Sequence, residues 1–314
     1  MVNILVTGGC GFVGRKLAEE LSKRKSYKVT VFDRNKKNPI PGVKYITGNI
    51  MDPDDVRKAV ENQDYVYHLA AILSEDSKMI YDVNLGGTIS VLEACRKENI
   101  KKLIYISTAG VMEESAEADE NTPYGPQTPY EKSKTMAEKT VREFQRRHGL
   151  PVTILRPALM YGPNKYWHSI LRMAEKAFPI IGPGKNTWHM LYIKNLIPVL
   201  VNARTRAKKG EIYVIADEKA YTYEEMHNII LEEMDVQKKP RHVPVWFAKL
   251  LALLYKARGK KSVLTLEHIN RLIKNKNYDI SKAKKELKYK PEYDFRKGIR
   301  ETIKYFRDEG LLKR

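Results

Sequence analysis

A tyrosine and a lysine lie four residues apart in the stretch YEKSK, residues 130–134. Positions i and i+4 share one face of a helix, so the side chains of Tyr130 and Lys134 would be neighbours if this stretch is helical. A phenol with a pKa of about 10 is a poor base at neutral pH, and a nearby ammonium favours the phenolate. The pair could therefore exchange a proton with a substrate. The alternative is an exposed tyrosine and a solvated lysine, and residues upstream decide between the two.

Three glycines near the N-terminus have a spacing suited to phosphate binding. Gly8, Gly11 and Gly14 in TGGCGFVG, residues 7–14, follow an apolar run and precede an amphipathic segment. In a strand–turn–helix unit, the first glycine permits the tight turn, the second lets a pyrophosphate approach the backbone, and the third lets helix and strand pack closely. The free N–H groups at the start of the helix favour phosphate. This context predicts dinucleotide binding.

Asp33 is the expected partner of this glycine loop. It ends the second apolar run, 19 residues after Gly14. A carboxylate there can accept hydrogen bonds from both hydroxyls of an adenosine ribose and would repel a 2′-phosphate, so NAD is favoured. NADP stays an alternative because the neighbouring Arg34 could hold that phosphate. Asp52 is expected to be a helix N-cap, with a contact to adenine as a second alternative.

Alternating strands and helices would place these residues at one edge of a sheet. We expect strands at 3–8, 28–33, 43–49, 64–71, 102–108 and 152–158, and helices at 14–24, 52–62, 83–99 and 130–148. This rhythm implies a parallel sheet with helices on both faces. The predicted fold class is α/β, a doubly wound Rossmann sheet followed by a smaller, mostly helical C-terminal substrate lobe.

The regular alternation of strands and helices ends at about residue 160. The stretches 161–169 and 180–188, rich in Pro, Gly and aromatic residues, are expected to be loops near a pocket. Residues 211–218 predict a late strand, and the chain from 221 onward is mostly helical and basic. The expected domains are a dinucleotide-binding domain at 1–162, to which 188–220 returns, and a substrate lobe at 163–187 and 221–314.

Composition excludes several classes of protein. With 314 residues, 42% of them hydrophobic, the chain can bury a sizeable core. Two cysteines, Cys10 and Cys95, are too few for a disulfide framework or a structural zinc site, so no metal is expected and a reducing, cytoplasmic setting is favoured. The net charge of +19 suits an anionic ligand or surface. No nucleic-acid-binding motif occurs, so no specific nucleic-acid partner is expected.

Residues 243–257, VPVWFAKLLALLYKA, come nearest to a membrane span. They fall short of the roughly 18 apolar residues that cross a bilayer, and Lys249 and Lys256 interrupt them. We expect no transmembrane segment. The stretch predicts a buried helix, with peripheral contact to a membrane surface as the alternative. The N-terminal apolar run lacks a basic flank and is expected to be a strand rather than a signal peptide.

The order and spacing of these motifs resemble the extended short-chain dehydrogenase/reductase family. That family includes NAD-dependent epimerases and dehydratases of nucleotide sugars and enzymes like 3β-hydroxysteroid dehydrogenase. The resemblance covers most of the chain through TGGCGFVG (7–14), Asp33, HLAA (68–71), VNLGGT (83–88), YISTAGV (105–111), YEKSK (130–134), LRPALMYGP (155–163) and YDISKAKKELKYKP (278–291). It implies an NAD-dependent oxidoreductase.

The resemblance implies that Tyr130 and Lys134 are the catalytic pair and that Lys134 also bonds the nicotinamide ribose. The third member would be a hydroxyl in ISTAG, residues 106–110, where Thr108 is favoured and Ser107 is the competitor. At the carboxyl end of a strand, Thr108 would face the crevice in which open parallel sheets bind ligands. Tyr130 would take a proton when a secondary alcohol is oxidised and return it when a ketone is reduced.

The cofactor contacts implied by the resemblance follow several strands. They are Gly8, Gly11, Phe12, Val13, Gly14, Asp33, Arg34, Asn49, Ile50, Leu69, Ala70, Ala71, Tyr130, Lys134 and Pro157. The resemblance also implies a homodimer that pairs through the helices at 83–99 and 130–148.

Two substrate classes stay open. One is a small or apolar secondary alcohol or ketone, as for 3β-hydroxysteroid dehydrogenase-like enzymes and ketoreductases. The other is a nucleotide sugar, with Lys165, Lys185 and Arg204 either as phosphate clamps or as ordinary surface charges. Leu159 favours the first class, because epimerases of the family usually carry a diphosphate-binding asparagine there. A dehydratase is disfavoured, because TAG, residues 108–110, lacks the extra acidic pair.

Two further hypotheses concern the pocket and the class of protein. Tyr166, Trp167, Trp188 and His189 either line the pocket or pack in the core. MLYIKNLI, residues 190–197, resembles the family's return strand and helix start. A dinucleotide-binding scaffold or redox sensor without turnover is an alternative to an enzyme, although such relatives often lose the tyrosine or lysine that this chain keeps.

Overall fold

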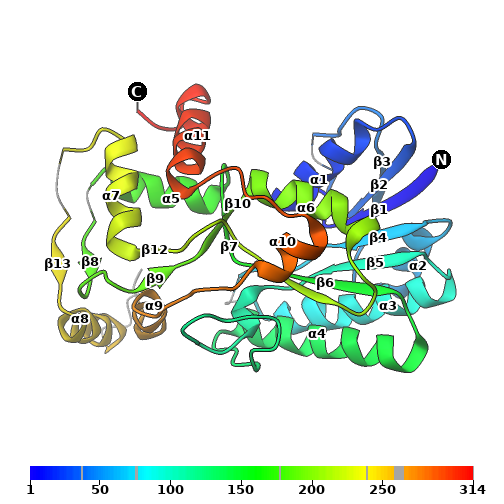
Figure 1. Cartoon of the computed structure of the whole chain (residues 1–314), viewed down its shortest axis with the longest axis horizontal. Helices are drawn as coiled ribbons and strands as arrows, with labels where there is room; N and C mark the ends of the chain where they lie inside the picture. The colour runs from blue at the N-terminus through cyan, green and yellow to red at the C-terminus, as the bar shows by residue number, and fades with distance from the viewer. Residues whose placement is uncertain (37, 75–76, 177, 238–239, 258–264, 314) are drawn as a thin grey trace.

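A seven-stranded sheet forms the centre of the N-terminal part of the protein (Figure 1). The computed structural model describes the whole chain except residues 37, 75–76, 177, 238–239, 258–264 and 314. All pairings in this sheet are parallel, in the order β11-β6-β5-β4-β1-β2-β3. The strands are β1 (Val2–Thr7), β2 (Tyr27–Asp33), β3 (Lys44–Thr47), β4 (Tyr65–His68), β5 (Lys102–Ile106), β6 (Val152–Pro157) and β11 (Ile212–Ile215). The order reverses between β1 and β4, and ligands bind at such a switch point.

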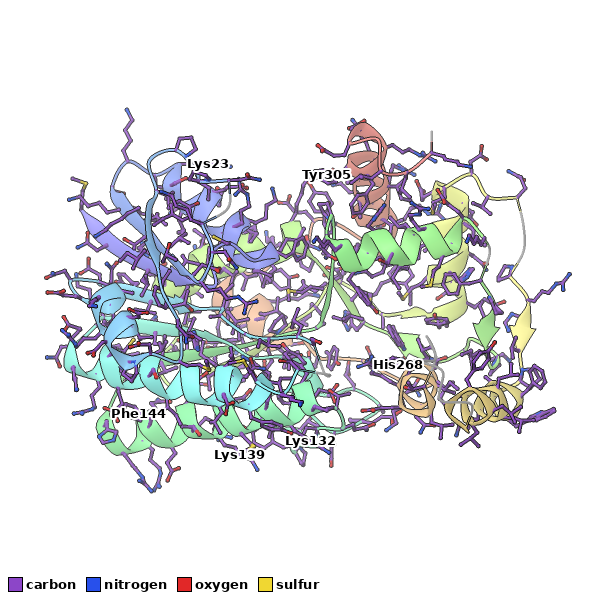
Figure 2. The ribbon with its side chains drawn as sticks, turned by 180° about the vertical axis from the view of Figure 1, so that it is seen from behind. Lys23, Lys132, Lys139, Phe144, His268 and Tyr305 are labelled. Carbon is purple, nitrogen blue, oxygen red and sulfur yellow. The ribbon has the colours of Figure 1, made fainter. Side chains whose placement is uncertain are left out.

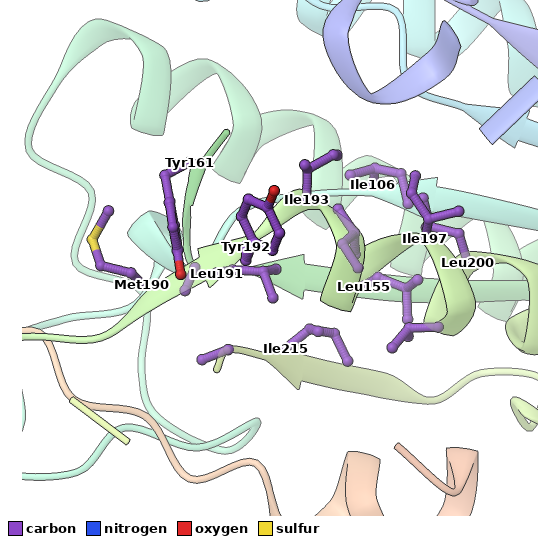
Figure 3. Packing of buried hydrophobic residues seen from close by; sticks show 14 of the residues in the cluster. Ile106, Leu155, Tyr161, Met190, Leu191, Tyr192, Ile193, Ile197, Leu200 and Ile215 are labelled. Atoms are coloured by element: carbon purple, nitrogen blue, oxygen red, sulfur yellow. The ribbon is translucent and has the colours of Figure 1, made fainter. Parts of the chain in front are cut away.

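Helices cover both faces of this sheet, which confirms the doubly wound fold. One face carries α1 (Phe12–Ser22), α6 (Ile193–Arg206) and α10 (Ser281–Leu287), and the other carries α2 (Pro53–Val60), α3 (Gly87–Lys97) and α4 (Pro129–His148). Side chains alternate between the faces along each strand, so Ile4 packs with the first group and Leu5 with the second. Figure 3 shows Ile197 and Leu200 of α6 over Leu155 of β6.

The starts of α2 and α4 follow from local sequence signals. The side chain of Asp52 accepts hydrogen bonds from the main-chain N–H groups of Asp54 and Asp55, as its predicted N-cap role requires. At the start of α4, Thr128 and Glu131 form a capping box. This cap places Tyr130 in the first turn of α4.

Two predicted helices begin differently in the structure. The helix expected at 14–24 begins at Phe12, because Gly11 already serves as its N-cap. The helix expected at 83–99 begins with a π-helical turn, Asp82–Gly86, which continues directly into α3. Single π turns occur frequently at functional sites.

The C-terminal lobe is helical with short strand pairs. Its helices are α5 (Lys165–Ala174), α7 (Tyr223–Glu233), α8 (Val245–Ala257), α9 (Leu266–Leu272) and α11 (Phe295–Asp308). Three pairs of short strands accompany them: β7 (Leu159–Tyr161) with β10 (Met190–Tyr192), β9 (Thr187–Trp188) with β12 (Tyr221–Thr222), and β8 (Ile180–Ile181) with β13 (His242–Val243). The expected return strand and helix at 190–197 are β10 and the start of α6.

The loop expected at 161–169 is partly helical. Asn164 caps α5 by accepting a hydrogen bond of 3.0 Å from the N–H group of Trp167. Trp167, Leu171 and Ala174 then follow at helical spacing and are buried. The loop prediction for residues 165–169 is therefore wrong, because an N-cap and an apolar stripe outweigh the local aromatic and Pro/Gly content.

Aromatic side chains join the lobe to the sheet. Tyr161 contacts the rings of Trp167, Tyr192 and Phe295, with the Tyr161 and Tyr192 centroids 5.0 Å apart (Figure 3). The cluster is buried and belongs to the same core as α1 and α6. It makes the lobe continuous with the dinucleotide-binding half.

The prediction of a buried helix over 243–257 is wrong. Only Ala248 and Ala252 are buried among the described side chains of α8, whereas Trp246 is 68% exposed. Across the part of the chain that the structure describes, no helix has the length and apolar character of a membrane span.

Candidate active site

The glycine-rich turn follows β1 and requires glycine at its first and last positions. Gly8 has a φ of +68°, and its N–H group donates a hydrogen bond of 2.8 Å to the carbonyl oxygen of Phe32. A Cβ atom on Gly14 would lie 2.3 Å from the carbonyl oxygen of Gly8. Glycine therefore permits both the left-handed turn and the close packing of α1 on it.

The N-terminus of α1 fits the pyrophosphate of a dinucleotide. Gly11, its N-cap, offers no side chain to the helix. The N–H groups of Phe12, Val13 and Gly14 lie in the first turn, where no intrahelical acceptor exists, and the helix dipole there favours negative charge. The glycine turn also packs on the loop after β4, because a Cβ atom on Gly8 would lie 2.8 Å from the Cα atom of Ala70. Leu69, Ala70 and Ala71 are half-buried in that loop.

Asp33 is held beside the glycine turn. Its two carboxylate oxygens accept hydrogen bonds from the N–H groups of Cys10 at 3.0 Å and Asn35 at 3.2 Å. The side chain is half-buried, and that of Arg34 is exposed. Asn49 follows β3, and its N–H group donates to Asp55. The arrangement fits a ribose at the end of β2, and the individual contacts of Asp33, Arg34, Asn49, Ile50 and Pro157 to a cofactor stay predictions.

Lys134 and Thr108 both lie near the carboxyl end of β5, and Tyr130 lies one turn before Lys134 in α4. Lys134 lies one turn after Tyr130 in α4, and its ammonium donates a hydrogen bond of 2.7 Å to the carbonyl oxygen of Ile106. The outer face of the same helix carries the exposed Lys132 and Lys139 (Figure 2). Two residues after Ile106, Thr108 caps a short turn and accepts a hydrogen bond of 3.2 Å from the N–H group of Gly110. A Cβ atom on Gly110 would lie 2.9 Å from Glu131, so the turn after β5 adjoins the first turn of α4. The segments that carry the three residues are neighbours, and the catalytic roles stay predictions.

Ser107 is bonded elsewhere. It is buried, and its hydroxyl donates a hydrogen bond of 2.5 Å to Glu138. Glu138 forms a buried ion pair with Arg156, with Nη2 and Oε1 2.7 Å apart. Thr108 is half-buried and has no such carboxylate partner among the described residues. The geometry therefore favours Thr108 over Ser107 as the hydroxyl available to a substrate.

The pKa values of the pair differ from the sequence-based expectation. Burial, followed by the charge of Glu131, raises the pKa of the Tyr130 phenol. Burial lowers the pKa of Lys134 to about 7, against an opposing effect of Glu138. The expectation that Lys134 lowers the pKa of Tyr130 is not met, because the lysine has itself lost much of its preference for the charged form.

A supporting residue that the sequence analysis left without a role is Asn84. It lies in the π turn before α3, and its amide exchanges hydrogen bonds of 2.7 and 3.0 Å with the main chain of Ile72. It also donates to the hydroxyl of Ser133, which in turn donates to the carbonyl oxygen of Tyr130. Asn84 therefore ties the loop after β4 to the first turn of α4. The VNLGGT motif signalled this position without indicating its contacts.

A cavity of about 390 Å³ lies beside this site. One wall comes from residues near the predicted catalytic groups, Gly110, Thr128 and Glu131, and the other comes from α9 and the segment after it, including Arg271, Lys274, Lys276 and Tyr278. The Lys276 ammonium lies 4.7 Å from the ring centroid of Trp188. Burial lowers the pKa of Lys276 to about 8. The cavity wall carries charges of both signs, because Glu113, Glu114, Glu131 and Glu267 line it as well.

The three suggested phosphate clamps do not line this cavity. Lys165 and Lys185 are exposed. Arg204 donates a hydrogen bond of 2.6 Å to the Tyr27 hydroxyl and stacks over the rings of Tyr27 and Tyr65. Those tyrosines begin β2 and β4, at the opposite edge of the sheet from Thr108. The clamp hypothesis for Arg204 is wrong, because aromatic packing holds the guanidinium at the wrong edge.

Tyr166, Trp167, Trp188 and His189, the side chains proposed for a pocket, are not among the described residues that line the cavity. Trp167, Trp188 and His189 are buried in the core. His189 is hydrogen-bonded to the carbonyl oxygen of Asp217 at 2.8 Å. Tyr166 is 59% exposed. Core packing is therefore the correct alternative for the three buried residues.

Comparison with known proteins identifies the family. The model of the NAD dependent epimerase/dehydratase family matches residues 4–216. The chain belongs to this family. It also resembles two curated proteins along nearly its whole length. A 3beta-hydroxysteroid-dehydrogenase/decarboxylase isoform 1 of Arabidopsis thaliana is 30% identical, covering 96% of this chain and 79% of that protein. A UDP-N-acetyl-alpha-D-glucosaminuronate decarboxylase of Bacillus cytotoxicus is 30% identical, covering 97% of both.

Solved structures show the same fold. The UDP-glucose 4-epimerase of Thermotoga maritima with UDP-glucose has a TM-score of 0.81 and 24% identity, covering 98% of this chain and 99% of that one. The UDP-glucuronic acid 4-epimerase of Bacillus cereus in complex with NAD gives the same TM-score, identity and coverage. These structures confirm the predicted fold. The family match and the 30% identical relatives show an NAD-dependent enzyme of the extended short-chain dehydrogenase/reductase type, which confirms the predicted family and enzyme class.

Proposed function

We propose that the protein is a net dehydrogenase or reductase that transfers hydride between NAD and the carbon of a secondary alcohol or ketone. The observation that supports this proposal is the hydrogen bond from Lys134 to Ile106, which holds the helix of Tyr130 against the strand end that precedes Thr108, next to a cavity lined by Gly110 and Glu131. Groups placed there can hold a substrate oxygen while its carbon reacts.

Each residue has a distinct role in this reaction. The Thr108 hydroxyl orients the substrate oxygen, and the Tyr130 phenolate accepts its proton as the alcohol is oxidised. NAD, when bound, supplies the hydride acceptor and a positively charged ring. Lys134 holds α4 against β5 through Ile106. When protonated, Lys134 would act with the positive ring of bound NAD against the burial that raises the pKa of Tyr130. In ketone reduction, Tyr130 returns the proton to the oxygen.

An apolar alcohol or ketone is the favoured substrate class. Leu159, 37% exposed in β7, has no polar atom with which to hold a diphosphate. The 30% identity to the 3beta-hydroxysteroid-dehydrogenase/decarboxylase extends over 96% of this chain, so it includes the lobe that forms one cavity wall. A UDP-N-acetyl-alpha-D-glucosaminuronate decarboxylase is equally identical over 97% of the chain. Leu159 is therefore the observation that favours a substrate like that of the 3β-hydroxysteroid dehydrogenases.

A nucleotide-sugar epimerase is the second candidate. Arg271, Lys274 and Lys276 on the cavity wall could contact an anionic substrate, although four glutamates line the same cavity and Glu114 pairs with Lys274. In that reaction the hydride would leave one substrate carbon and return to it, with no net change in NAD.

Absorbance of NADH distinguishes the two candidates. The purified enzyme would be mixed with NAD and a panel of secondary alcohols that includes sterols, and separately with UDP-sugars. The proposal predicts NADH accumulation with a secondary alcohol and none with UDP-sugars. Inversion of configuration at a sugar carbon of a UDP-sugar, without NADH accumulation, would contradict the proposal and support the epimerase.

We further infer that the protein is a cytoplasmic homodimer. Its two domains would be the dinucleotide-binding domain at 1–162 with 188–220 and the substrate lobe at 163–187 and 221–314. Ile89 on α3 and Met136 on α4 are exposed apolar side chains on the two helices expected to pair. Two free cysteines, Cys10 and Cys95, suit a reducing compartment. The molar mass measured by light scattering in solution tests the dimer, and a monomer that persists at high concentration would contradict it.

A further inference from the structure

Helix α8 buries its small side chains and exposes its large ones. Ala248 and Ala252 lie one turn apart and pack against Ile181 and Ile269. The exposed face carries Trp246, Phe247, Leu250, Leu251, Leu253, Leu254 and Tyr255, each between 38% and 68% exposed. A helix that needs only the core of its own chain would bury the leucines and expose the alanines. This reversed arrangement indicates that the outer face contacts another apolar phase.

The chain around α8 is strongly basic. Between Asp235 and Glu267 the sequence contains no acidic residue, and its basic residues are Lys238, Lys239, Arg241, Lys249, Lys256, Arg258, Lys260 and Lys261. Of the described side chains, Arg241 is exposed just before β13, and Lys249 is half-buried on α8. An apolar face with positive charge beside it complements a surface that is apolar inside and anionic at its rim.

We propose that α8 docks the protein on an anionic lipid bilayer, with the helix lying in the plane of the interface. The seven large side chains enter the headgroup and acyl boundary, and Arg241 and Lys249 contact anionic headgroups. The 13 residues of α8 are too few to cross a bilayer, so the contact is peripheral. α8 lies at the end of the molecule opposite the N-terminal strands, where a flat surface can reach it (Figure 1).

A second copy of the chain fits the exposed face of α8 less well than an anionic bilayer does. A two-fold contact through α8 would bring two basic segments without acidic residues close together, because the same surface forms both sides of such an interface. Like charges at that position would oppose the association. Anionic lipid instead neutralises them.

Docking through α8 would bring the bilayer close to the cavity. α8 packs on α9, whose Leu266 and Ile269 share an apolar cluster with it, and Figure 2 shows His268 of α9 beside α8. Glu267, Asn270 and Arg271 of the same helix α9 line the cavity. One helix therefore separates the docking face from the proposed substrate site. The docking proposal itself does not depend on which reaction the enzyme performs.

Vesicle flotation tests the proposal. Full-length protein would be mixed with vesicles of phosphatidylcholine alone or with added phosphatidylglycerol, at low and high salt. We expect binding to the anionic vesicles that falls at least tenfold at high salt and in a variant combining Trp246→Ser, Leu250→Ser and Leu254→Ser. The control Leu311→Ser removes a leucine of similar exposure, 49% against 47% for Leu254, at the far C-terminus and should bind normally.

Two further measurements check that the triple variant is folded and that Trp246 enters the bilayer. Circular dichroism of the triple variant should show an unchanged fold, because the removed side chains contact solvent. Tryptophan emission should shift to the blue on anionic vesicles, and this shift should disappear in Trp246→Phe. Absence of binding, equal binding to both vesicle types, or equal binding by the triple variant would overturn the proposal. So would a dimer that the triple substitution converts to a monomer, because α8 would then be covered by a second copy.

Discussion

The ammonium group of Lys134 donates a hydrogen bond of 2.7 Å to the main-chain carbonyl oxygen of Ile106. Ile106 is the last residue of β5, and Lys134 lies in the second turn of α4. The bond therefore fixes the helix that carries Tyr130 to the strand end that precedes Thr108. It does so with a buried amine, whose charged form is costly in an apolar surrounding.

Lys134 should lower stability as the pH falls from about 10 to about 7. The folded pKa of about 7 lies below the ordinary value of 10.5, so the unfolded chain binds the extra proton in this window and folding loses free energy as the pH falls. Below pH 7 the lysine is protonated in both states and the loss is complete. Its size should be roughly 3 kcal/mol between pH 10 and pH 7.

Urea unfolding of the wild type and of Lys134→Met at both pH values measures this effect. The methionine variant should gain stability relative to the wild type as the pH falls, because it has no proton to bind. An equal difference between the two proteins at pH 10 and pH 7 would contradict the lowered pKa.

Substitution of Thr108 should lower kcat, whereas substitution of Ser107 should lower the free energy of unfolding. Thr108→Val removes the hydroxyl proposed to orient the substrate and should reduce kcat by about a hundredfold or more with little change in unfolding free energy. Ser107→Ala breaks the hydrogen bond to Glu138 and should cost about 1–3 kcal/mol of stability. Steady-state kinetics and urea unfolding of both variants make the comparison. The reverse pattern would assign the substrate contact to Ser107.

Glu138 should be critical for stability. Glu138→Gln leaves Arg156 buried without its anionic partner and should destabilise the fold by about 3–5 kcal/mol. Glu143→Gln on the same helix is the matched control, because its ion pair with Arg147 is exposed and should contribute at most about 1 kcal/mol. Thermal unfolding of the two variants tests the prediction, and similar losses would refute it.

Asp33 should set the preference for NAD. Asp33→Ala removes the carboxylate that opposes a 2′-phosphate, while the exposed Arg34 remains to attract it. The ratio of kcat/KM for NAD to that for NADP should fall at least tenfold. Asp54→Asn, exposed at the start of α2, should leave the ratio unchanged. A wild-type enzyme that prefers NADP would contradict the assignment.

Local sequence rules predicted the residues whose role depends on the backbone. The spacing of Gly8, Gly11 and Gly14 is readable because a turn, a close approach and a packed helix each need glycine. Asp52 and Pro53 mark the start of α2 for equally local reasons. These features need no knowledge of distant contacts, so the dinucleotide-binding half could be predicted well.

Properties set by distant packing were not predictable in the same way. The charge of Arg204 does not reveal that Tyr27 and Tyr65 hold it at the wrong edge of the sheet. The apolar composition of 243–257 does not reveal that alanines, and not leucines, face the core. The pKa values of Tyr130 and Lys134 depend on how deeply both are buried, which spacing cannot show.

The kinetics of Tyr130→Phe test the central claim most directly. The claim is that the phenol of Tyr130 transfers the proton in an NAD-dependent redox reaction at the carboxyl end of β5. The variant keeps the aromatic ring, so it should bind NADH with unchanged affinity and lose at least a thousandfold in kcat with the best secondary alcohol. Equal kcat in the variant and the wild type, or a wild-type protein that binds NADH and turns over no substrate, would contradict the account.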